Sequence, residues 1–318
     1  RPRRTEAMTI LVTGASGLVG SAFARAAARR GHRVVGITGK HTGSLEGVST
    51  RVPLDLTDEG ATTSAVLEAF PEAIVNCAAV SVPEQCVADP ARAQALNVTL
   101  PGLLGRLAHH VSGRVVHLSS EQVFDGERTT PYTSADAPCP INLYARQKLA
   151  GEQAVLTAAP EFATVLRLPL LMGNSPGGAR SNHERLLADW AAGRTPRLFT
   201  DEFRQPCTAD NVAEVVLEIC ERNDTRGLFH WAGTELLSRH EMGVRIRDHF
   251  KLTGKQAPLE AVRRSDNPEA LRSRQACLAL DCTPLAGRLK TRPQSFAAQL
   301  EELHVPVPVR AWYHGLGV

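Results

Sequence analysis

The chain has 318 residues, of which 43% are hydrophobic and 22% are charged, and its formal net charge at pH 7 is +3. This length and composition suit a folded protein with a sizeable core. Lys and Arg are spread along the chain, which argues against nucleic acid as a partner. No apolar run approaches the roughly 18 residues that span a bilayer, and no secretory hydrophobic region is visible. We therefore expect no membrane partner and a cytoplasmic location.

The first half of the chain alternates short β-branched runs with longer helical patterns. This alternation is typical of βαβ units, and it predicts a Rossmann-type, doubly wound parallel α/β sheet. Gly31 is expected just after the end of the first helix. The predicted strands are Thr9–Val12, Arg33–Ile37, Val52–Leu54, Ala73–Asn76, Arg114–Leu118 and Thr164–Leu168, and the predicted helices are Leu18–Arg30, Ala61–Phe70, Ala91–Ala108 and Leu143–Ala158.

The pattern loosens after Pro169 into a Gly/Ser/Pro-rich stretch from Gly173 to Ser181. We interpret residues 8–170 as the dinucleotide-binding domain with the catalytic residues. Residues 171–318 are interpreted as mainly a smaller α/β substrate-binding region, partly interleaved with the first. Its predicted elements are helices at His183–Ala192, after Asp210, at Arg239–Phe250 and at Gln294–Leu303, and strands at Leu228–Trp231 and Leu278–Leu280.

A glycine-rich turn follows the first predicted strand. Gly14, Gly17 and Gly20 have the spacing G-x-x-G-x-x-G between a strand and a helix, which is the context that a dinucleotide-binding motif requires. The first glycine permits the tight turn, the second lets the backbone approach a pyrophosphate, and the third allows close packing of helix on sheet. We therefore expect Gly14, Ser16, Gly17, Leu18 and Val19 to contact the cofactor, with the phosphates at the helix N-terminus.

The end of the second strand indicates which dinucleotide is preferred. An NAD-selective site places a carboxylate there, on the ribose 2′-hydroxyl, whereas this segment has none. Thr38 and Lys40 can instead contact a 2′-phosphate, so NADP(H) is preferred and NAD(H) stays possible. The alternative is that Lys40 is an ordinary loop lysine.

Other strand ends supply further cofactor candidates. Asp55 and Leu56 follow the third strand, where an Asp suits the adenine amine; a helix N-cap is the alternative use of this segment, through Thr57 or Asp58. Small residues after the fourth strand suit close packing against the cofactor. The remaining predicted cofactor contacts are Cys77, Ala78, Ala79, Asn97, Leu118, Ser119 and Leu168.

A Ser, a Tyr and a Lys form the candidate catalytic group. Ser120 ends the fifth strand, and Tyr144 and Lys148 lie four residues apart on one face of the next helix. A free tyrosine has a pKa of about 10, and we expect the neighbouring cation and NADP⁺ to lower it, so that Tyr144 acts as acid and base. Lys148 would also hold the nicotinamide ribose, and Ser120 would bond the substrate oxygen.

With these motifs the sequence resembles the extended short-chain dehydrogenase/reductase family, and within it the branch of dTDP-4-dehydrorhamnose reductases. The resemblance covers nearly the whole chain from Met8. It implies that Ser120, Tyr144 and Lys148 are the catalytic triad and that Asn97 sets the active-site helix and its water network. The residues that carry the resemblance are Gly14-x-x-Gly17-x-x-Gly20, Asn76-x-Ala78-Ala79, Asn97, Ser119 to Gly126, Tyr144-x-x-x-Lys148 and Arg167-x-Pro169.

The chain departs from that branch after Ser120. The usual Asp-Tyr is replaced by Glu121 and Gln122, which affects contacts near the reacting carbon. Related 4,6-dehydratases carry Asp-Glu there, so only half of the elimination machinery is present. The candidate substrate contacts are Val80, Ser81, Glu121, Gln122, Arg204, Gln205, Arg272 and Arg274. Arginine forks suit a nucleotide diphosphate, and a solvated charged surface is the alternative.

The residues favour an NADP(H)-dependent reductase of a nucleotide-linked 4-keto sugar. A second hypothesis is a binding subunit without turnover, because Phe229-His230-Trp231-x-Gly233 and Leu280-Asp281-Cys282 are similar to the regulatory β subunit of methionine adenosyltransferase. A sugar-nucleotide 4-epimerase with NAD is the third. A homodimer is left open. The odd number of cysteines, seven, without a C-x-x-C pair suits a reducing compartment, and no metal is predicted.

Overall fold

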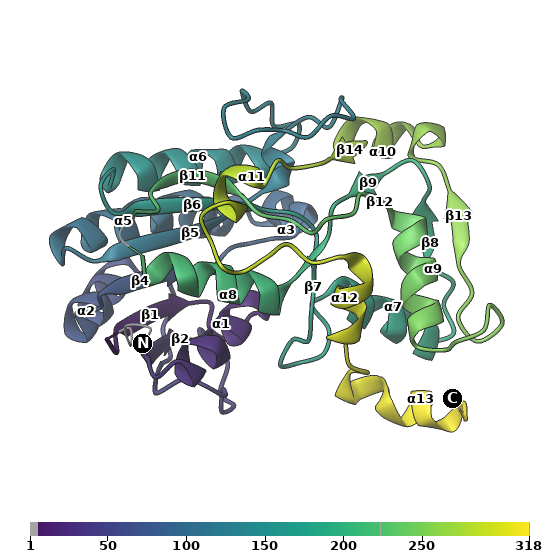
Figure 1. Cartoon of the computed structure of the whole chain (residues 1–318), viewed down its shortest axis with the longest axis horizontal. Helices are drawn as coiled ribbons and strands as arrows, with labels where there is room; N and C mark the ends of the chain where they lie inside the picture. The colour runs from purple at the N-terminus through teal and green to yellow at the C-terminus, as the bar shows by residue number, and fades with distance from the viewer. Residues whose placement is uncertain (1–5, 223, 318) are drawn as a thin grey trace.

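A computed structural model describes residues 6–222 and 224–317, and its centre is a parallel sheet of seven strands (Figure 1). The strand order is β11-β6-β5-β4-β1-β2-β3. The order reverses between β1 and β4, which is the Rossmann arrangement, so the predicted fold class is confirmed. The strands are β1 Thr9–Thr13, β2 Arg33–Ile37, β3 Thr50–Val52, β4 Ala73–Asn76, β5 Arg114–Ser120, β6 Ala163–Leu168 and β11 Gly227–His230.

Helices cover both faces of this sheet. One face packs against α1 and α8, and the other packs against α2, α5 and α6. Gly31 has a positive φ of 87° directly after the turn that ends α1, as the sequence predicted. The helices of this part are α1 Leu18–Arg29, α2 Glu59–Ala69, α3 Pro83–Ala88, α4 Pro90–Gln94, α5 Leu100–His110, α6 Leu143–Ala158 and α8 Ala209–Cys220.

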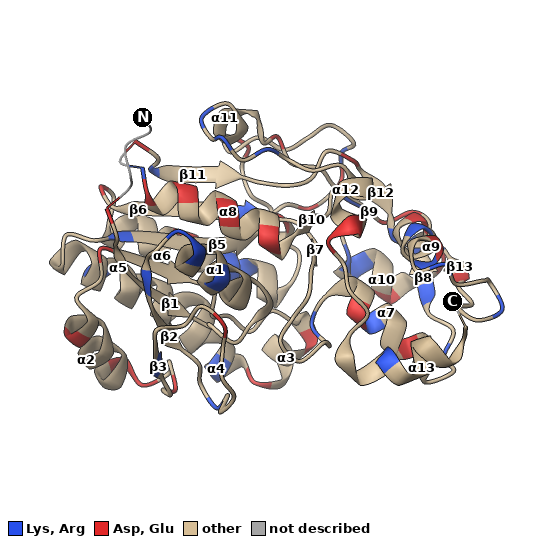
Figure 2. Ribbon diagram, turned by 60° about the horizontal axis from the view of Figure 1, so that its bottom comes forward, with Lys and Arg blue, Asp and Glu red and all other residues tan. Residues whose placement is uncertain are grey.

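A row of ion pairs joins α1 to α8, two helices that are far apart in the sequence (Figure 2). Arg25 pairs with Asp210 at 3.2 Å, and Arg30 pairs with Glu214 at 2.7 Å and with Glu221 at 2.6 Å. Ion pairs at the surface are each worth only about 0–1 kcal/mol. The row therefore favours the alignment of the two helices, but it contributes little to their attachment.

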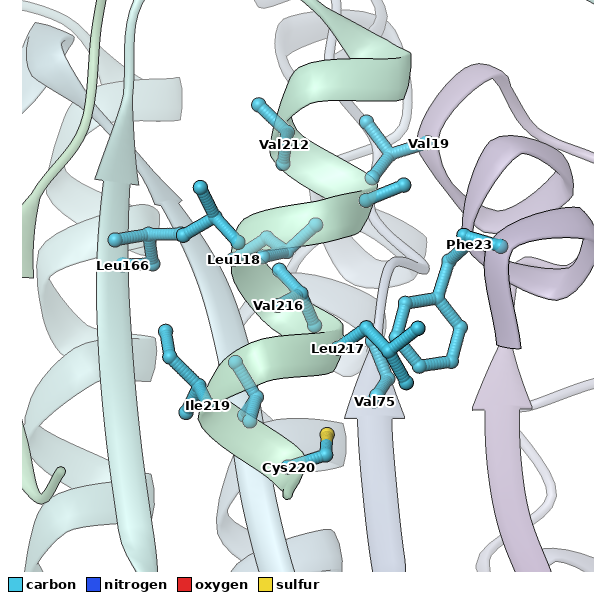
Figure 3. Close-up of a cluster of buried hydrophobic side chains, with 14 of the residues drawn as sticks. Val19, Phe23, Val75, Leu118, Leu166, Val212, Val216, Leu217, Ile219 and Cys220 are labelled. Carbon is cyan, nitrogen blue, oxygen red and sulfur yellow. The ribbon is translucent and has the colours of Figure 1, made fainter. Parts of the chain in front are cut away.

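The attachment comes from the apolar core between these helices and the sheet (Figure 3). Phe23 of α1 and Val216 and Leu217 of α8 are fully buried. They pack against strand residues such as Val75 and Leu166, which are also fully buried. Both faces of a parallel sheet are covered in this way, which is why its strands read as continuous apolar runs.

The smaller region packs beside the carboxyl ends of the main strands (Figure 1). Its core includes Trp190, Met242, Phe250 and Phe296. Its strands are β7 Leu171–Met172, β8 Arg197–Phe199, β9 Phe203–Arg204, β10 Cys207–Thr208, β12 Leu237–Ser238, β13 Glu260–Val262 and β14 Cys277–Leu278. Its helices are α7 Asn182–Ala191, α9 Arg239–His249, α10 Pro268–Ser273, α11 Thr283–Ala286, α12 Phe296–Glu301 and α13 Arg310–Gly315.

The structure corrects three of the predicted elements. The strand expected at Val52–Leu54 is β3, which pairs with β2 from Thr50 to Val52 and ends there. The helix expected at Ala91–Ala108 contains a π-helical turn at Ala95–Thr99. The strand expected at Leu228–Trp231 is β11, and it joins the main sheet beside β6 instead of the smaller region. None of the described helices is long and apolar enough to cross a membrane.

Truncation of a core residue on α8 should reveal how much this packing stabilises the fold. Leu217 is fully buried, so Leu217→Ala should lower the free energy of unfolding by about 2–5 kcal/mol, through lost burial and the cavity that remains. Urea denaturation measures this change. Leu67→Ala on α2 is the matched control, because Leu67 is 41% exposed. Equal losses in the two variants would contradict the packing described for α8.

Candidate active site

The glycine turn lies at the carboxyl end of β1, beside the point where the strand order reverses. Gly14 has a φ of 62°, and a Cβ added to it would lie 3.0 Å from the backbone nitrogen of Ala78. A Cβ on Gly20 would lie 2.2 Å from the carbonyl oxygen of Gly14, a distance that no side chain tolerates. Gly17 is the N-cap of α1, and no side chain caps this helix. The amides of Leu18 and Val19, in the first turn, are therefore open to an anion.

A chain of hydrogen-bonded side chains joins the ends of β1 and β4 to the middle of β5. The Thr13 hydroxyl accepts from the Ala78 amide at 3.2 Å and donates to Asn76 Oδ1 at 2.6 Å. The Asn76 side-chain nitrogen lies 3.0 Å from Nδ1 of His117. These contacts fix the ends of β1 and β4 relative to each other and to the middle of β5. They hold the loop that begins with Cys77, Ala78 and Ala79 against the glycine turn.

Ser120 and Tyr144 come together, as the sequence predicted. Ser120 ends β5, and Tyr144 lies in the first turn of α6, whose N-cap Asn142 accepts from the Ala145 amide at 2.8 Å. Both side chains are buried. Burial raises the pKa of Tyr144 to about 12, and a hydrogen bond with Ser120 opposes this shift. The phenol is thus neutral at pH 7 and holds its proton next to the serine hydroxyl.

Lys148 lies one turn further along α6 and is also buried. Its ammonium donates to the carbonyl oxygen of Leu118 at 2.6 Å. Burial lowers the pKa of Lys148 to about 8, and Glu152 opposes that shift. In the protein alone, loss of solvent dominates at the phenol, and the Lys148 ammonium is directed at the Leu118 carbonyl. The lowering of the Tyr144 pKa by this cation together with bound NADP⁺ stays a prediction.

Asn97 ties the loop after β4 to α6. Its Oδ1 accepts from the Val80 amide at 2.9 Å, and its Nδ2 donates to the Val80 carbonyl at 3.1 Å and to Gln147 Oε1 at 3.2 Å. Asn97 lies in the π-helical turn, and a Cβ on Gly151 of α6 would be 2.2 Å from its carbonyl oxygen. The close approach of the two helices therefore depends on Gly151. A contact of Asn97 with the cofactor stays a prediction.

A buried ion pair joins α6 to β6. Arg167 Nε and Nη2 donate to the two oxygens of Glu152 at 2.9 and 2.7 Å, and both side chains are fully buried. The Ser119 hydroxyl donates to the same carboxylate. Glu152 was not predicted as a site residue, although Tyr144, Lys148 and Glu152 repeat at intervals of four and share one helix face. That spacing was the signal that could have identified it.

Glu121 follows Ser120 and is buried beside Arg204. Arg204 Nε lies 3.4 Å from Glu121 Oε1, and the second oxygen has no hydrogen-bond partner among the described residues. Burial raises the pKa of Glu121 to about 8, although Arg204 and Arg239 oppose this. The carboxyl group is therefore largely protonated at neutral pH and can donate or accept a hydrogen bond.

Arg204, Arg239 and Arg274, here called the arginine cluster, gather around Glu202, and Arg204 also pairs with Glu121. Glu202, fully buried, accepts from Arg274 at 2.6 and 2.9 Å and lies 3.3 Å from Arg204. Arg239 donates to Asn182 at 3.1 Å. Sequence analysis identified Arg204 and Arg274 but missed Arg239, which begins α9 and carries no local motif. With Glu121 largely protonated, positive charge is in excess at this side of the site.

Several predicted substrate residues take other roles. The side-chain amide of Gln205 is hydrogen-bonded to backbone groups: its Nε2 donates to the Gly233 carbonyl at 2.6 Å, and its Oε1 accepts from the Leu280 amide at 2.9 Å. Arg272 and Ser81 are exposed, and Gln122 is half-buried and donates its backbone N–H to Ser120 Oγ at 3.2 Å. Val80 is half-buried and held by Asn97. Contact of these residues with substrate stays a prediction.

The predicted adenine and ribose contacts lie at the ends of β2 and β3. Asp55 is exposed, accepts from the Thr57 amide at 3.1 Å and pairs with Arg92 at 3.2 Å. The N-cap of α2 is Asp58, so Asp55 is not needed for that role. Thr38 is buried and Lys40 is exposed. Ser16 is half-buried in the glycine turn, whereas Leu56, Leu118 and Leu168 are buried.

A family model described as the RmlD substrate binding domain matches residues 8–307, and the chain belongs to this family. The resemblance to dTDP-4-dehydrorhamnose reductases is thereby confirmed. A probable low-salt glycan biosynthesis reductase, Agl14 of Haloferax volcanii, is 33% identical over 89% of this chain and 92% of its own length. The dTDP-4-dehydrorhamnose reductase of Mycolicibacterium smegmatis is 32% identical over 74% of this chain and 67% of its length.

A third relative points to a different kind of protein. Methionine adenosyltransferase 2 subunit beta of Xenopus laevis is 31% identical over 86% of this chain and 80% of its own length.

Among solved structures, dTDP-4-dehydrorhamnose reductase from Bacillus anthracis in complex with NADP matches with a TM-score of 0.80, 19% identity, and coverage of 93% of this chain and 98% of that one. This last likeness supports the fold.

The raised pKa of Glu121 should make stability depend on pH. Its pKa is about 8 in the folded protein against 4.5 ordinarily, so between these values the folded protein holds a proton that the unfolded chain releases. The free energy of unfolding of the wild type should therefore fall as pH rises through that window. Glu121→Gln removes this titration, so the variant should gain stability relative to the wild type from about pH 5 to about pH 8 in urea denaturation.

The matched control is Glu127→Gln, which changes an exposed glutamate of the same loop. This variant should follow the wild-type pH profile. If Glu121→Gln instead lost stability relative to the wild type as pH rises, Glu121 would be ionised in the folded protein and paired with Arg204.

Proposed function

We propose that this chain is an NADP(H)-dependent reductase that acts on a nucleotide-linked 4-keto sugar. The observation that carries the proposal is the buried pair of Ser120 and Tyr144, one helical turn from Lys148, at the same sheet edge as the glycine turn. A binding protein has no need of a phenol kept neutral beside a serine hydroxyl. A reductase needs both groups at the reacting carbonyl.

The chemistry of the three side chains fits carbonyl reduction. The cofactor supplies a hydride when bound. Tyr144, whose pKa burial raises to about 12, is a neutral phenol at pH 7 and donates the proton to the carbonyl oxygen. Ser120 hydrogen-bonds that oxygen and stabilises the negative charge that develops on it. Lys148 would hold the nicotinamide ribose and, once turned from the Leu118 carbonyl, its charge would stabilise the phenolate that Tyr144 becomes when it gives up its proton.

The glycine turn fits a dinucleotide. A Cβ on Gly14 or Gly20 would meet backbone, and the uncapped N-terminus of α1 offers amides to a pyrophosphate. The segment after β2 has no carboxylate for a ribose 2′-hydroxyl, and Thr38 and Lys40 lie there instead, which favours NADP(H) over NAD(H). The NADP complex of the Bacillus anthracis reductase supports a nicotinamide cofactor on this fold.

The arginine cluster supports an anionic substrate. Arg204, Arg239 and Arg274 outnumber the carboxylates beside them, and the raised pKa of Glu121 enlarges this excess of positive charge. Guanidinium groups bind diphosphates through paired hydrogen bonds, so a nucleotide diphosphate sugar fits this charge. The reductase names of the Haloferax and Mycolicibacterium relatives agree with a sugar-linked reduction.

The second candidate is a binding subunit, favoured by the identity with methionine adenosyltransferase 2 subunit beta. The segment that suggested it, around Trp231, has a structural role in this chain. Trp231 is fully buried, its indole N–H donates to Asn211 at 2.8 Å, and Gly233 accepts from Gln205. Because these contacts stabilise the fold, the shared segment is weak support for a shared partner.

The decisive test is oxidation of NADPH with a panel of nucleotide-linked 4-keto sugars. Tyr144→Phe should lower kcat by about 10²–10⁴-fold, because it removes the proton donor, and should leave NADPH affinity nearly unchanged. Tyr313→Phe makes the same change in the smaller region, where the hydroxyl bonds the Phe250 carbonyl, and should retain wild-type activity.

Other outcomes point to the alternatives. NADPH binding without turnover of any sugar by the wild type would favour the binding subunit. Interconversion of 4-epimers with tightly held NAD and no net oxidation would favour the epimerase.

A further inference from the structure

Arg180 of the smaller region lies over the glycine turn of the dinucleotide site. A Cβ built on Gly17 would be 3.8 Å from Arg180 Nη1. Gly17 precedes α1 at the position where the backbone approaches a pyrophosphate. Arg180 belongs to the segment between β7 and α7, which is far from Gly17 in the sequence (Figure 1). No local motif indicated that the two meet.

The backbone that carries Arg180 is held in place by a buried carboxylate. Glu184, which is 2% exposed, accepts from the amides of Arg180 at 2.8 Å and Ser181 at 2.9 Å through Oε2. Its Oε1 accepts from the Ser175 amide at 2.7 Å. One carboxylate thus fixes the backbone of this loop at both of its ends, and with it the position from which the Arg180 side chain extends.

A second contact joins the same segment to α1. A Cβ on Gly173, whose φ is 131°, would be 3.5 Å from Leu18 Cδ1. Leu18 is the first residue of α1. The segment between β7 and α7 therefore contacts α1 twice. Gly173, at the start of the segment, packs against Leu18, and Arg180, near the end of the segment, lies over Gly17.

The charges at this point favour an anion. The first turn of α1 contains no acidic residue and no side chain caps it. Arg180 is exposed, and within residues 6–222 and 224–317 its guanidinium makes no ion pair. Backbone amides at a helix N-terminus together with a guanidinium fork are the donors that bind phosphate groups.

We propose that Arg180 binds the pyrophosphate of the dinucleotide, so that the smaller region closes the cofactor site. The proposal rests on the proposed function only in requiring a dinucleotide on the glycine turn. The alternative anion, the 2′-phosphate of NADP, belongs at the end of β2 near Thr38 and Lys40, whereas Arg180 lies against Gly17.

The test measures dissociation constants of NADP⁺ and NAD⁺ by calorimetry for the wild type, Arg180→Ala and Arg180→Lys. Loss of one charge-assisted contact should raise Kd about tenfold for both dinucleotides in Arg180→Ala, because they share the pyrophosphate. Arg180→Lys should retain part of the affinity, since lysine also binds phosphate as a point charge. The loss should shrink at high salt, because Arg180 is exposed.

Arg185→Ala is the matched control, because Arg185 is an exposed arginine in the first turns of α7 and its removal should leave both affinities unchanged. An unchanged Kd in Arg180→Ala would overturn the proposal. So would a loss confined to NADP⁺, which would place Arg180 on the 2′-phosphate. If the wild type bound neither dinucleotide, the proposed function itself would fall, and that result is distinct from an effect of Arg180.

Discussion

The buried ion pair between Glu152 and Arg167 is the contact on which the site depends most. It joins α6 to β6, and Ser119 joins the same carboxylate to β5. Removing one partner of such a pair leaves an uncompensated charge in the core, at a cost of about 3–5 kcal/mol. Tyr144 and Lys148 belong to α6, so the position of both residues relative to the strand ends depends on this ion pair. Glu152 and Arg167 thus help to position the proposed catalytic side chains of α6.

The sequence predicted the parts of the site that local patterns encode. Strand, glycine turn and helix follow one another in the chain, so Gly14 to Val19 could be found without a structure, and Tyr144 and Lys148 were found from their helical spacing. Arg239 and Arg180 could not be found in this way, because each meets its site through tertiary packing. The π-helical turn at Ala95–Thr99 was also missed. It lies in a tertiary contact, because the carbonyl oxygen of its residue Asn97 is 2.2 Å from the Cβ position of Gly151.

Electrostatics within the site depend on burial more than on neighbours. Proximity of Lys148 to Tyr144 in the helix suggested a lowered phenol pKa, whereas loss of solvent raises it to about 12. The same effect lowers the pKa of Lys148 and raises that of Glu121. A residue pattern predicts which groups meet but does not give their solvation, because solvation depends on everything packed around them.

The two parts of the chain divide the work of the site. The main sheet carries the proposed catalytic side chains on strand ends and on α6. The smaller region supplies cations: the arginine cluster around Glu202, and Arg180 over the glycine turn. Arg180 and Asn182 lie in one short segment, and Asn182 accepts from Arg239. That segment therefore touches both the glycine turn and the arginine cluster. Because the cations lie outside the sheet, the smaller region can change which anions bind while the reacting groups on the sheet stay in place.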